Sequence, residues 1–163
     1  MNIVSWNCKG LGDSLKAEVV KDLSRMDYPD ILLLQETKIE EASLLSLSKK
    51  NWKKDAGMAM SARGSSSGLA TLWTEELFSL KKSFKTQHWI FIELRHSQSN
   101  ISFNIFNIYV PVNFQEKRDC WNSLANFLAA YTPSNLIVVG DLNIKLDPKE
   151  KKGGVSGRDL VHK

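Results

Sequence analysis

The feature that most limits the fold is a run of four apolar residues, Ile31-Leu32-Leu33-Leu34. The run is too short to form a helix of its own, and a strand that is covered on both faces needs no polar residue at alternate positions. Tyr28-Pro29 comes just before it, and a proline disfavours helical backbone in the residue that precedes it. We therefore expect residues 31–34 to form a strand that is buried on both faces.

Strands and helices are expected on both sides of this run. Residues 14–26 carry apolar side chains near helical spacing, including Leu15, Val19 and Val20, and residues 115–131 carry a second stripe of this kind. A shorter helix is expected at residues 40–50. Strand-like runs fall at residues 2–6, 69–73, 78–84, 89–95, 101–110 and 136–139, and the last is expected to be buried. Short polar connections favour antiparallel neighbours, and helices that flank such strands indicate a layered α+β fold.

The composition favours one domain that covers residues 1–163. A chain of 163 residues can bury a core without a disulfide or a structural metal. The two cysteines, Cys8 and Cys120, lie in no CxxC or Cys/His cluster, which fits a reducing compartment. We find no signal peptide and no apolar run of the roughly 20 residues that cross a bilayer, so we expect no membrane partner and an intracellular location, in the nucleus or cytoplasm. The net charge of +4 favours a polyanionic partner.

Polar side chains follow three of the expected strands at the point where each strand ends. They are Asn7, the pair Gln35-Glu36, and the pair Asp141 and Asn143. Loops at strand ends are where a scaffold usually carries its chemistry. This recurrence points to one site that is built from residues far apart in the sequence.

These strand ends carry motifs that resemble the endonuclease/exonuclease/phosphatase family, which has the DNase-I-like fold. The resemblance implies an α/β/β/α sandwich and runs from Met1 to about Arg158. The first residues of the chain and the run at residues 147–154 are most similar to endonuclease domains of LINE-type retrotransposons. The matching motifs, in chain order, are Ser5-Trp6-Asn7, Leu34-Gln35-Glu36-Thr37-Lys38, Gly68-Leu69-Ala70, Asn107-Ile108-Tyr109-Val110-Pro111 and Gly140-Asp141-Leu142-Asn143.

The resemblance also implies the roles of five residues. Cleavage of a phosphodiester gathers negative charge on phosphate oxygens, which a divalent cation relieves. Glu36 is implied as the main ligand of Mg²⁺, or of Mn²⁺, and Asn7, its carboxamide neighbour, as the second residue of the metal site. Asp141 is implied to orient or deprotonate the attacking water. Asn143 and the Tyr109 hydroxyl are implied to donate hydrogen bonds to the phosphate.

Each of these residues also has a plainer interpretation. Glu36 could end a strand in water, as most glutamates do. The Gly-Asp-x-Asn segment is ordinary turn chemistry, because Asp and Asn bond their own backbone. Tyr109 could be a tyrosine at the edge of the core. Trp52 is the one tryptophan among lysines, and there a solvated basic face is the simpler account. The ordered set of motifs, rather than any single residue, favours the functional interpretation.

The chain lacks motifs that full-length members of the family carry after Asp141, namely a further aspartate and a Ser-Asp-His segment. None of His88, His96 and His162 follows an aspartate in such a segment. We therefore expect a C-terminally truncated domain whose nuclease activity alone is negligible. DNA is the expected ancestral substrate. The alternatives are a non-catalytic remnant that binds nucleic acid or metal weakly, and an enzyme that acts on RNA or a lipid phosphate. The oligomeric state stays open.

Overall fold

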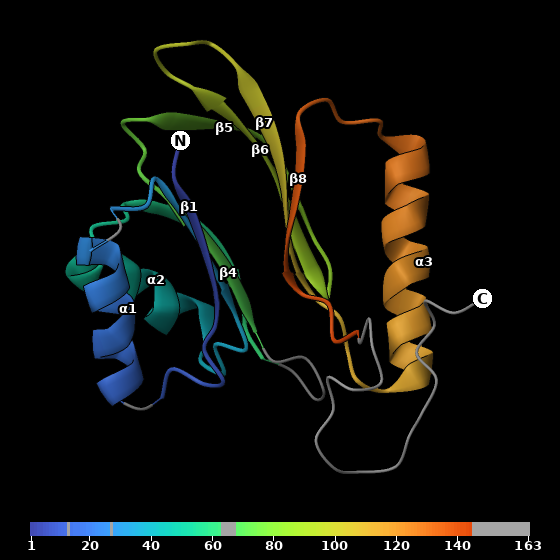
Figure 1. Ribbon diagram of the computed structural model, residues 1–163, viewed down its shortest axis with the longest axis horizontal. Helices are drawn as coiled ribbons and strands as arrows, with labels where there is room; N and C mark the ends of the chain where they lie inside the picture. Colours follow the sequence, from blue (N-terminus) through green and yellow to red (C-terminus); the bar gives the residue numbers. More distant parts are fainter. Residues whose placement is uncertain (13, 27, 63–67, 145–163) are drawn as a thin grey trace.

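The computed structural model describes residues 1–12, 14–26, 28–62 and 68–144, which form two four-stranded sheets and three helices. The sheets face each other; α1 and α2 cover the outer face of one, and α3 covers the outer face of the other (Figure 1). The first sheet has the strand order β1-β2-β4-β3 and the second β5-β6-β7-β8. In chain order the elements are β1 (Ile3–Asn7), α1 (Ser14–Met26), β2 (Ile31–Gln35), α2 (Glu41–Asn51), β3 (Ala56–Met60), β4 (Leu69–Trp73), β5 (Phe78–Lys85), β6 (Trp89–His96), β7 (Ser102–Tyr109), α3 (Phe114–Ala130) and β8 (Leu136–Asp141).

The apolar run in β2 serves two cores at once. Leu32 and Leu34 pack with α1 and α2 on the outer face of the sheet, while Ile31 and Leu33 pack into the core between the sheets. All four side chains have no exposed surface. Successive side chains of a strand point to opposite faces, so a continuous apolar run fits this layer. The expected strand at residues 31–34 is confirmed.

The second sheet is held to α3 by aromatic packing. Strands β5, β6 and β7 run antiparallel, and β8 joins β7 in parallel. Phe127 of α3 contacts Trp89, Phe91 and Phe106 with ring centroids 5.0–5.5 Å apart, a range in which edge-to-face pairs are favourable. The layers therefore follow the order helix, sheet, sheet, helix, and the expected α+β sandwich is confirmed.

Three expectations for individual segments need correction. Leu15 and Val19 of α1 are 74% and 45% exposed, so the buried face of this helix is narrower than the apolar stripe. The strand at residues 136–139 is not buried: β8 is the last strand of its sheet among the described residues, and Leu136 and Val138 are 38% and 46% exposed. Strands β4 and β5 are consecutive but lie in different sheets, so their short connection crosses the sandwich.

Several further observations complete the fold. Strand β3 was not predicted from the sequence. Cys8 and Cys120 are buried free thiols, in line with the expected absence of a disulfide. No described helix is both long enough and apolar enough to cross a membrane. The lysine-rich run at residues 147–154 and His162 lie outside the described residues.

Candidate active site where the two sheets meet

The two sheets bring their parallel strand pairs to the same end of the molecule. Asn7 ends β1 and is paired with Gln35, which ends the parallel strand β2. Tyr109 ends β7 and is paired with Asp141, which ends the parallel strand β8. Glu36 follows β2 directly. The strand ends that carried the motifs in the sequence are therefore neighbours in space.

The Asn7 carboxamide joins the two acidic residues. Its Nδ2 donates to Glu36 Oε1 at 2.9 Å and to Asp141 Oδ2 at 2.7 Å, which spends both of its amide hydrogens. The partners are 29 and 134 residues away in sequence. We call Asn7, Glu36 and Asp141 the acid–amide cluster. Asn7 Oδ1 accepts a hydrogen bond from Lys9 N at 3.1 Å, which fixes the orientation of the carboxamide.

The backbone around Glu36 is held in an unusual conformation. Glu36 has φ of +51°, in the left-handed region that non-glycine residues adopt rarely. Its carbonyl accepts from Gly10 N at 2.6 Å, and Thr37 N donates to Gly68 O at 3.2 Å. Gly68 has φ of +80°, and a Cβ there would overlap Thr37 Oγ1. Strained backbone persists only where its surroundings over-determine it, and it clusters at functional sites. The left-handed backbone of Glu36 is therefore held in place by the contacts with Gly10 and Gly68 on either side of it.

Glu36 also lies beside a lysine. Lys38 Nζ is 3.6 Å from Glu36 Oε2, and the two side chains are 54% and 17% exposed. An ion pair with so exposed a partner contributes little to stability, because solvent screens it. Lys38 instead adds positive charge at the rim of the acid–amide cluster, where an anionic ligand would approach.

Asp141 and Asn143 form the turn that follows β8. Gly140 has φ of +144°, and a Cβ at this position would collide with the Ile108 backbone, so only glycine fits there. Asn143 N donates to Asp141 Oδ1 at 3.0 Å, and Asn143 Nδ2 donates to Val110 O at 2.7 Å. The turn interpretation therefore fits these contacts: Asn143 N holds one oxygen of the Asp141 carboxylate, and the other oxygen accepts from Asn7.

Tyr109 lies next to this turn on the inner face of β7. It is half-buried and packs against the core between the sheets, so it is also the edge-of-core tyrosine of the plainer interpretation. Its backbone N donates to His88 O at 2.9 Å, which anchors the end of β7 to β6. The structure thus joins Asn7, Glu36 and Asp141 directly, links Asn143 through Asp141, and puts Tyr109 opposite Asp141 in the strand register.

A buried polar pair lies behind the acid–amide cluster and was given no role from the sequence. Gln35 Nε2 donates to Asn107 Oδ1 at 2.7 Å and to Ser5 Oγ at 3.1 Å. Asn107 Nδ2 donates to Leu34 O at 3.2 Å and Ala70 O at 2.8 Å. Gln35 and Asn107 are 1% and 0% exposed. Asn107 belongs to β7 and its partners to β2 and β4, so this pair ties the two sheets together. The available signal was an asparagine inside the apolar run of β7.

The donors of the acid–amide cluster suit a hard divalent cation. Among the described residues, no three His, Cys, Asp or Glu side chains are grouped so that they could hold a metal ion together. Magnesium, however, usually takes one or two protein carboxylates and keeps several of its waters. Glu36 and Asp141 supply two carboxylates that share one amide nitrogen within 2.9 Å. The donor set therefore fits Mg²⁺ or Mn²⁺, with the remaining positions left to water and phosphate oxygens.

Cys8 is excluded as a nucleophile at this site. It follows Asn7 directly and is 2% exposed. Burial raises the pKa of the Cys8 thiol to about 12. The thiolate is the reactive form of cysteine, so this side chain stays protonated and inert at neutral pH.

The fold and the cluster define a class: two-sheet α+β proteins with carboxylates where the strands of both sheets end. A family model for the endonuclease/exonuclease/phosphatase family matches residues 4–160, and the chain belongs to this family. The family consists of hydrolases that generally depend on a divalent metal. No curated protein matches the sequence.

Solved structures agree with this assignment. The human Nocturnin catalytic domain with bound sulfate superposes with a TM-score of 0.69 at 18% identity, covering 89% of this chain and 65% of that one. A humanized D. rerio TDP2 gives 0.66 at 17% identity, covering 89% and 63%. A mannosyl-6-phosphatase from Bacteroides thetaiotaomicron gives 0.65 at 12% identity, covering 88% and 66%. At these identities the likeness shows the fold, and the chain spans less than two thirds of the length of these relatives.

Proposed function

We propose that this chain carries the metal-binding and water-activating part of a magnesium-dependent phosphodiesterase site, of the retroelement DNA endonuclease type. One observation carries the proposal: the Asn7 carboxamide contacts both the Glu36 and the Asp141 carboxylates, from three strand ends in two sheets. Two carboxylates on one amide form a compact, negatively charged cluster, and hard divalent cations prefer such oxygen ligands.

The residues of the site then have the following roles. Bound magnesium supplies the positive charge that offsets charge on the phosphate oxygens. Glu36 is its carboxylate ligand, and Asn7 keeps Glu36 and Asp141 at a fixed separation. Asp141 accepts a proton from the attacking water, and its carboxylate is held in place by Asn7 Nδ2 at Oδ2 and by Asn143 N at Oδ1. Asn143 and Tyr109 donate to the phosphate oxygens.

DNA is the substrate that we favour. D. rerio TDP2, which has this fold, has been solved in complex with a single-stranded DNA product, at a TM-score of 0.65 and 19% identity. The net charge of +4 favours a polyanion. The likeness to LINE-type endonucleases at the first strand points the same way.

A second candidate, a phosphatase that acts on a phosphate monoester, is supported by the mannosyl-6-phosphatase of the same fold.

The 163 residues should catalyse weakly by themselves. They contain no Ser-Asp-His segment, and a positioned acid–base group contributes about 10²–10⁴-fold in rate. A charge stabiliser contributes about 10²–10³-fold, and such effects are not simply multiplied when they act in one site. We therefore propose that these 163 residues bind the metal but cleave orders of magnitude more slowly than a relative that carries such a segment.

Binding of Mn²⁺, followed by electron paramagnetic resonance, tests the metal site without requiring catalysis. The wild-type chain should bind the ion, and Glu36→Gln and Asp141→Asn should each weaken binding at least tenfold, about 1.4 kcal/mol. Glu76→Gln removes an equally charged but exposed carboxylate from the β4–β5 turn and should change nothing. Equal affinity in Glu36→Gln and wild type would refute the proposal.

Nicking of supercoiled plasmid in Mg²⁺ tests the activity separately. We expect no more than trace nicking from the 163-residue chain. Rapid nicking that Glu36→Ala abolishes would contradict the proposed weakness while supporting the site. Hydrolysis of a phosphate monoester such as p-nitrophenyl phosphate, with the same loss in Glu36→Ala and no action on plasmid, would favour the phosphatase instead.

A further inference from the structure

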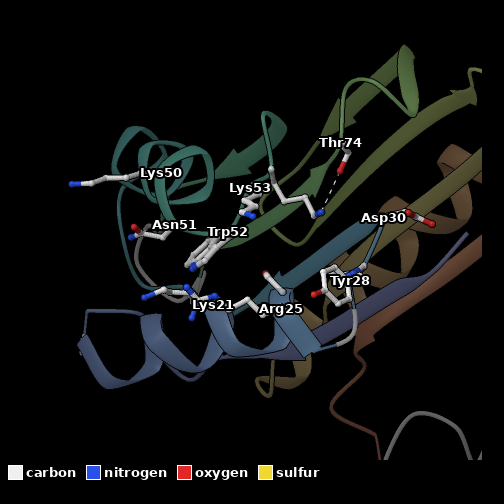
Figure 2. Close-up of a pocket in the computed structure, with 12 residues that line it drawn as sticks. Lys21, Arg25, Tyr28, Asp30, Lys50, Asn51, Trp52, Lys53 and Thr74 are labelled. Carbon is white, nitrogen blue, oxygen red and sulfur yellow. Dashed lines mark hydrogen bonds between the residues drawn. The ribbon is translucent and has the colours of Figure 1, made fainter.

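A cationic cavity lies at the end of the first sheet opposite the acid–amide cluster. Its volume is about 650 Å³, within the range of about 300–1,000 Å³ that is typical of ligand sites. It opens between the C-terminal ends of α1 and α2 and the entry to β2 (Figure 2). Asp30 on its wall and Glu36 are six residues apart along extended chain, which corresponds to roughly 20 Å. The cavity is therefore separate from the acid–amide cluster. We call it the α1–α2 cavity.

A buried lysine forms part of the wall of this cavity. Lys54 is only 8% exposed, and its Nζ donates to Thr74 Oγ1 at 3.2 Å, the contact that the dashed line in Figure 2 marks. No carboxylate among the described residues forms an ion pair with it. A buried ammonium is costly unless it is paired, and three donors are available on this group. Burial accordingly lowers the pKa of Lys54, although Asp30 and Asp55 act in the opposite direction.

The rest of the lining adds positive charge. Among the described residues the cavity is lined by five basic side chains and one acidic side chain, Asp30. Asp30 Oδ2 already accepts a hydrogen bond from Asn2 N at 2.7 Å. The basic side chains come from α1, from the end of α2 and from the segment that follows it (Figure 2). They are Lys21, which is paired with Glu18 at 2.7 Å, and Arg25, Lys50, Lys53 and Lys54.

Two further groups point to a polar ligand. Ser24 Oγ is buried, lines the cavity, and has no hydrogen-bond partner among the described residues. A buried hydroxyl without a partner costs free energy, which a ligand oxygen at this position would recover. Tyr28 also lines the cavity but is 79% exposed. An exposed aromatic ring next to basic side chains is the combination on which single-stranded nucleic acids bind, by stacking and by backbone contacts.

Trp52 does not provide such a stacking surface. It is 1% exposed, and its Nε1 donates to Ala17 O at 3.3 Å, so it joins α2 to α1 and forms part of the rigid cavity wall. The basic residues around it were interpreted as a solvated face from the sequence. The structure changes that interpretation for Lys54 alone, which lies inside, while Lys50 and Lys53 are exposed at the rim.

We propose that the α1–α2 cavity is a second contact for single-stranded nucleic acid, with one backbone phosphate bound by Lys54 and Ser24. Arg25, Lys50 and Lys53 contact flanking phosphates, and Tyr28 stacks on a base. The cavity is larger than a lone phosphate requires, and its basic side chains come from three segments of the chain, so a polymer fits better than a free ion. The proposal does not depend on the acid–amide cluster.

Fluorescence anisotropy with a labelled single-stranded DNA 12-mer in EDTA tests this site while divalent-ion chemistry is switched off. Lys54→Met removes the charge and keeps the apolar stem. It should weaken binding at least tenfold and lower the slope of log affinity against log salt by about one. Tyr28→Ala should weaken binding about fivefold or more, since stacking contributes about 1–3 kcal/mol per base. Inorganic phosphate should compete only at far higher concentrations than an unlabelled oligonucleotide.

Lys81→Met is the matched control, because it removes one exposed lysine from β5 in the other sheet. It should change affinity less than twofold. Circular dichroism and urea unfolding show whether Lys54→Met is folded. If this variant does not fold, Arg25→Gln, which changes an exposed side chain at the rim of the cavity, replaces it and should weaken binding. Wild-type affinity in folded Lys54→Met overturns the proposal, as does an equal loss in Lys81→Met. Equal affinity for inorganic phosphate and the oligonucleotide overturns the polymer as the ligand. None of these outcomes bears on Mn²⁺ binding at Glu36, which is tested separately.

Discussion

Replacing the Asn7 carboxamide by a carboxylate turns the acid–amide cluster into a direct test of the proposed metal site. In Asn7→Asp, an oxygen stands where Nδ2 now lies 2.9 Å from Glu36 Oε1 and 2.7 Å from Asp141 Oδ2. Two hydrogen bonds to charged acceptors are lost, and three carboxylates meet. Without a cation the folded state is opposed by like-charge repulsion. With a cation the same three groups form a stronger ligand set.

The magnitude follows from distance and exposure. Two unit charges 4 Å apart interact by about 1 kcal/mol in water and about 4 kcal/mol at an effective dielectric constant of 20. The Glu36 side chain is 17% exposed, so we expect the repulsion that it feels to lie between these two energies. Protonation of one carboxylate limits the cost, because like charges raise the pKa of their neighbours. We expect the free energy of unfolding to fall by about 3 kcal/mol in EDTA at pH 7. With a urea slope of about 2 kcal/mol per molar, the midpoint falls by about 1.5 M.

Urea unfolding, followed by tryptophan fluorescence, measures this in EDTA and again in Mg²⁺. The ion should restore most of the loss in Asn7→Asp and stabilise wild type less, because a ligand stabilises only the state that binds it. Asn122→Asp, an exposed change of the same chemistry on α3, should lose less than about 0.5 kcal/mol. The reasoning is refuted if Asn7→Asp is as stable as wild type in EDTA, or if Mg²⁺ acts equally on both.

Two further predictions concern groups beside the site. Asn107→Leu should lower the free energy of unfolding by about 2–4 kcal/mol, because it leaves Gln35 Nε2 and two carbonyls short of a partner in the core; a urea midpoint within 0.3 M of wild type would contradict this. Because burial raises the pKa of Cys8 to about 12, the folded chain keeps a proton that the unfolded chain loses above about 9. The stabilisation from this thiol is thus present below pH 9 and lost as the pH rises towards 12, so Cys8→Ala should flatten the fall in urea midpoint between pH 8 and 10.5. An unchanged pH slope would count against it.

Most of the elements could be predicted from the sequence because their patterns are local. The bounds of α1 and the burial of Ile31–Leu34 follow from spacing and run length within one segment. Strand β3 escaped prediction because Ala56-Gly57-Met58-Ala59-Met60 contains none of the β-branched or aromatic residues that mark strands. The exposure of Val138 escaped it as well. An apolar run has the same pattern whether its strand is central or at an edge, and only the packing of the other strands decides which.

The members of the candidate site could also be predicted, but their contacts could not. Motif order pointed to Asn7, Glu36 and Asp141, whereas nothing local says that one carboxamide contacts both acids across 29 and 134 residues. The same limit hid the Gln35–Asn107 pair, whose residues are 72 positions apart. Lys54 looked like any surface lysine, because burial depends on where α1 and α2 pack rather than on its neighbours in sequence.

The position of the acid–amide cluster links its chemistry to the packing of the sheets. Asn7 belongs to β1 and Asp141 to β8, and among the described residues each of these strands has a single hydrogen-bonded neighbour. The separation of the two side chains is therefore set less by either sheet than by how the sheets meet. The hydrogen bond between Gln35 and Asn107 holds the two sheets together directly behind the cluster. By linkage, a cation that requires the cluster in its folded geometry stabilises the packed sheets, and loosening the packing through Asn107 weakens cation binding although Asn107 touches no ligand.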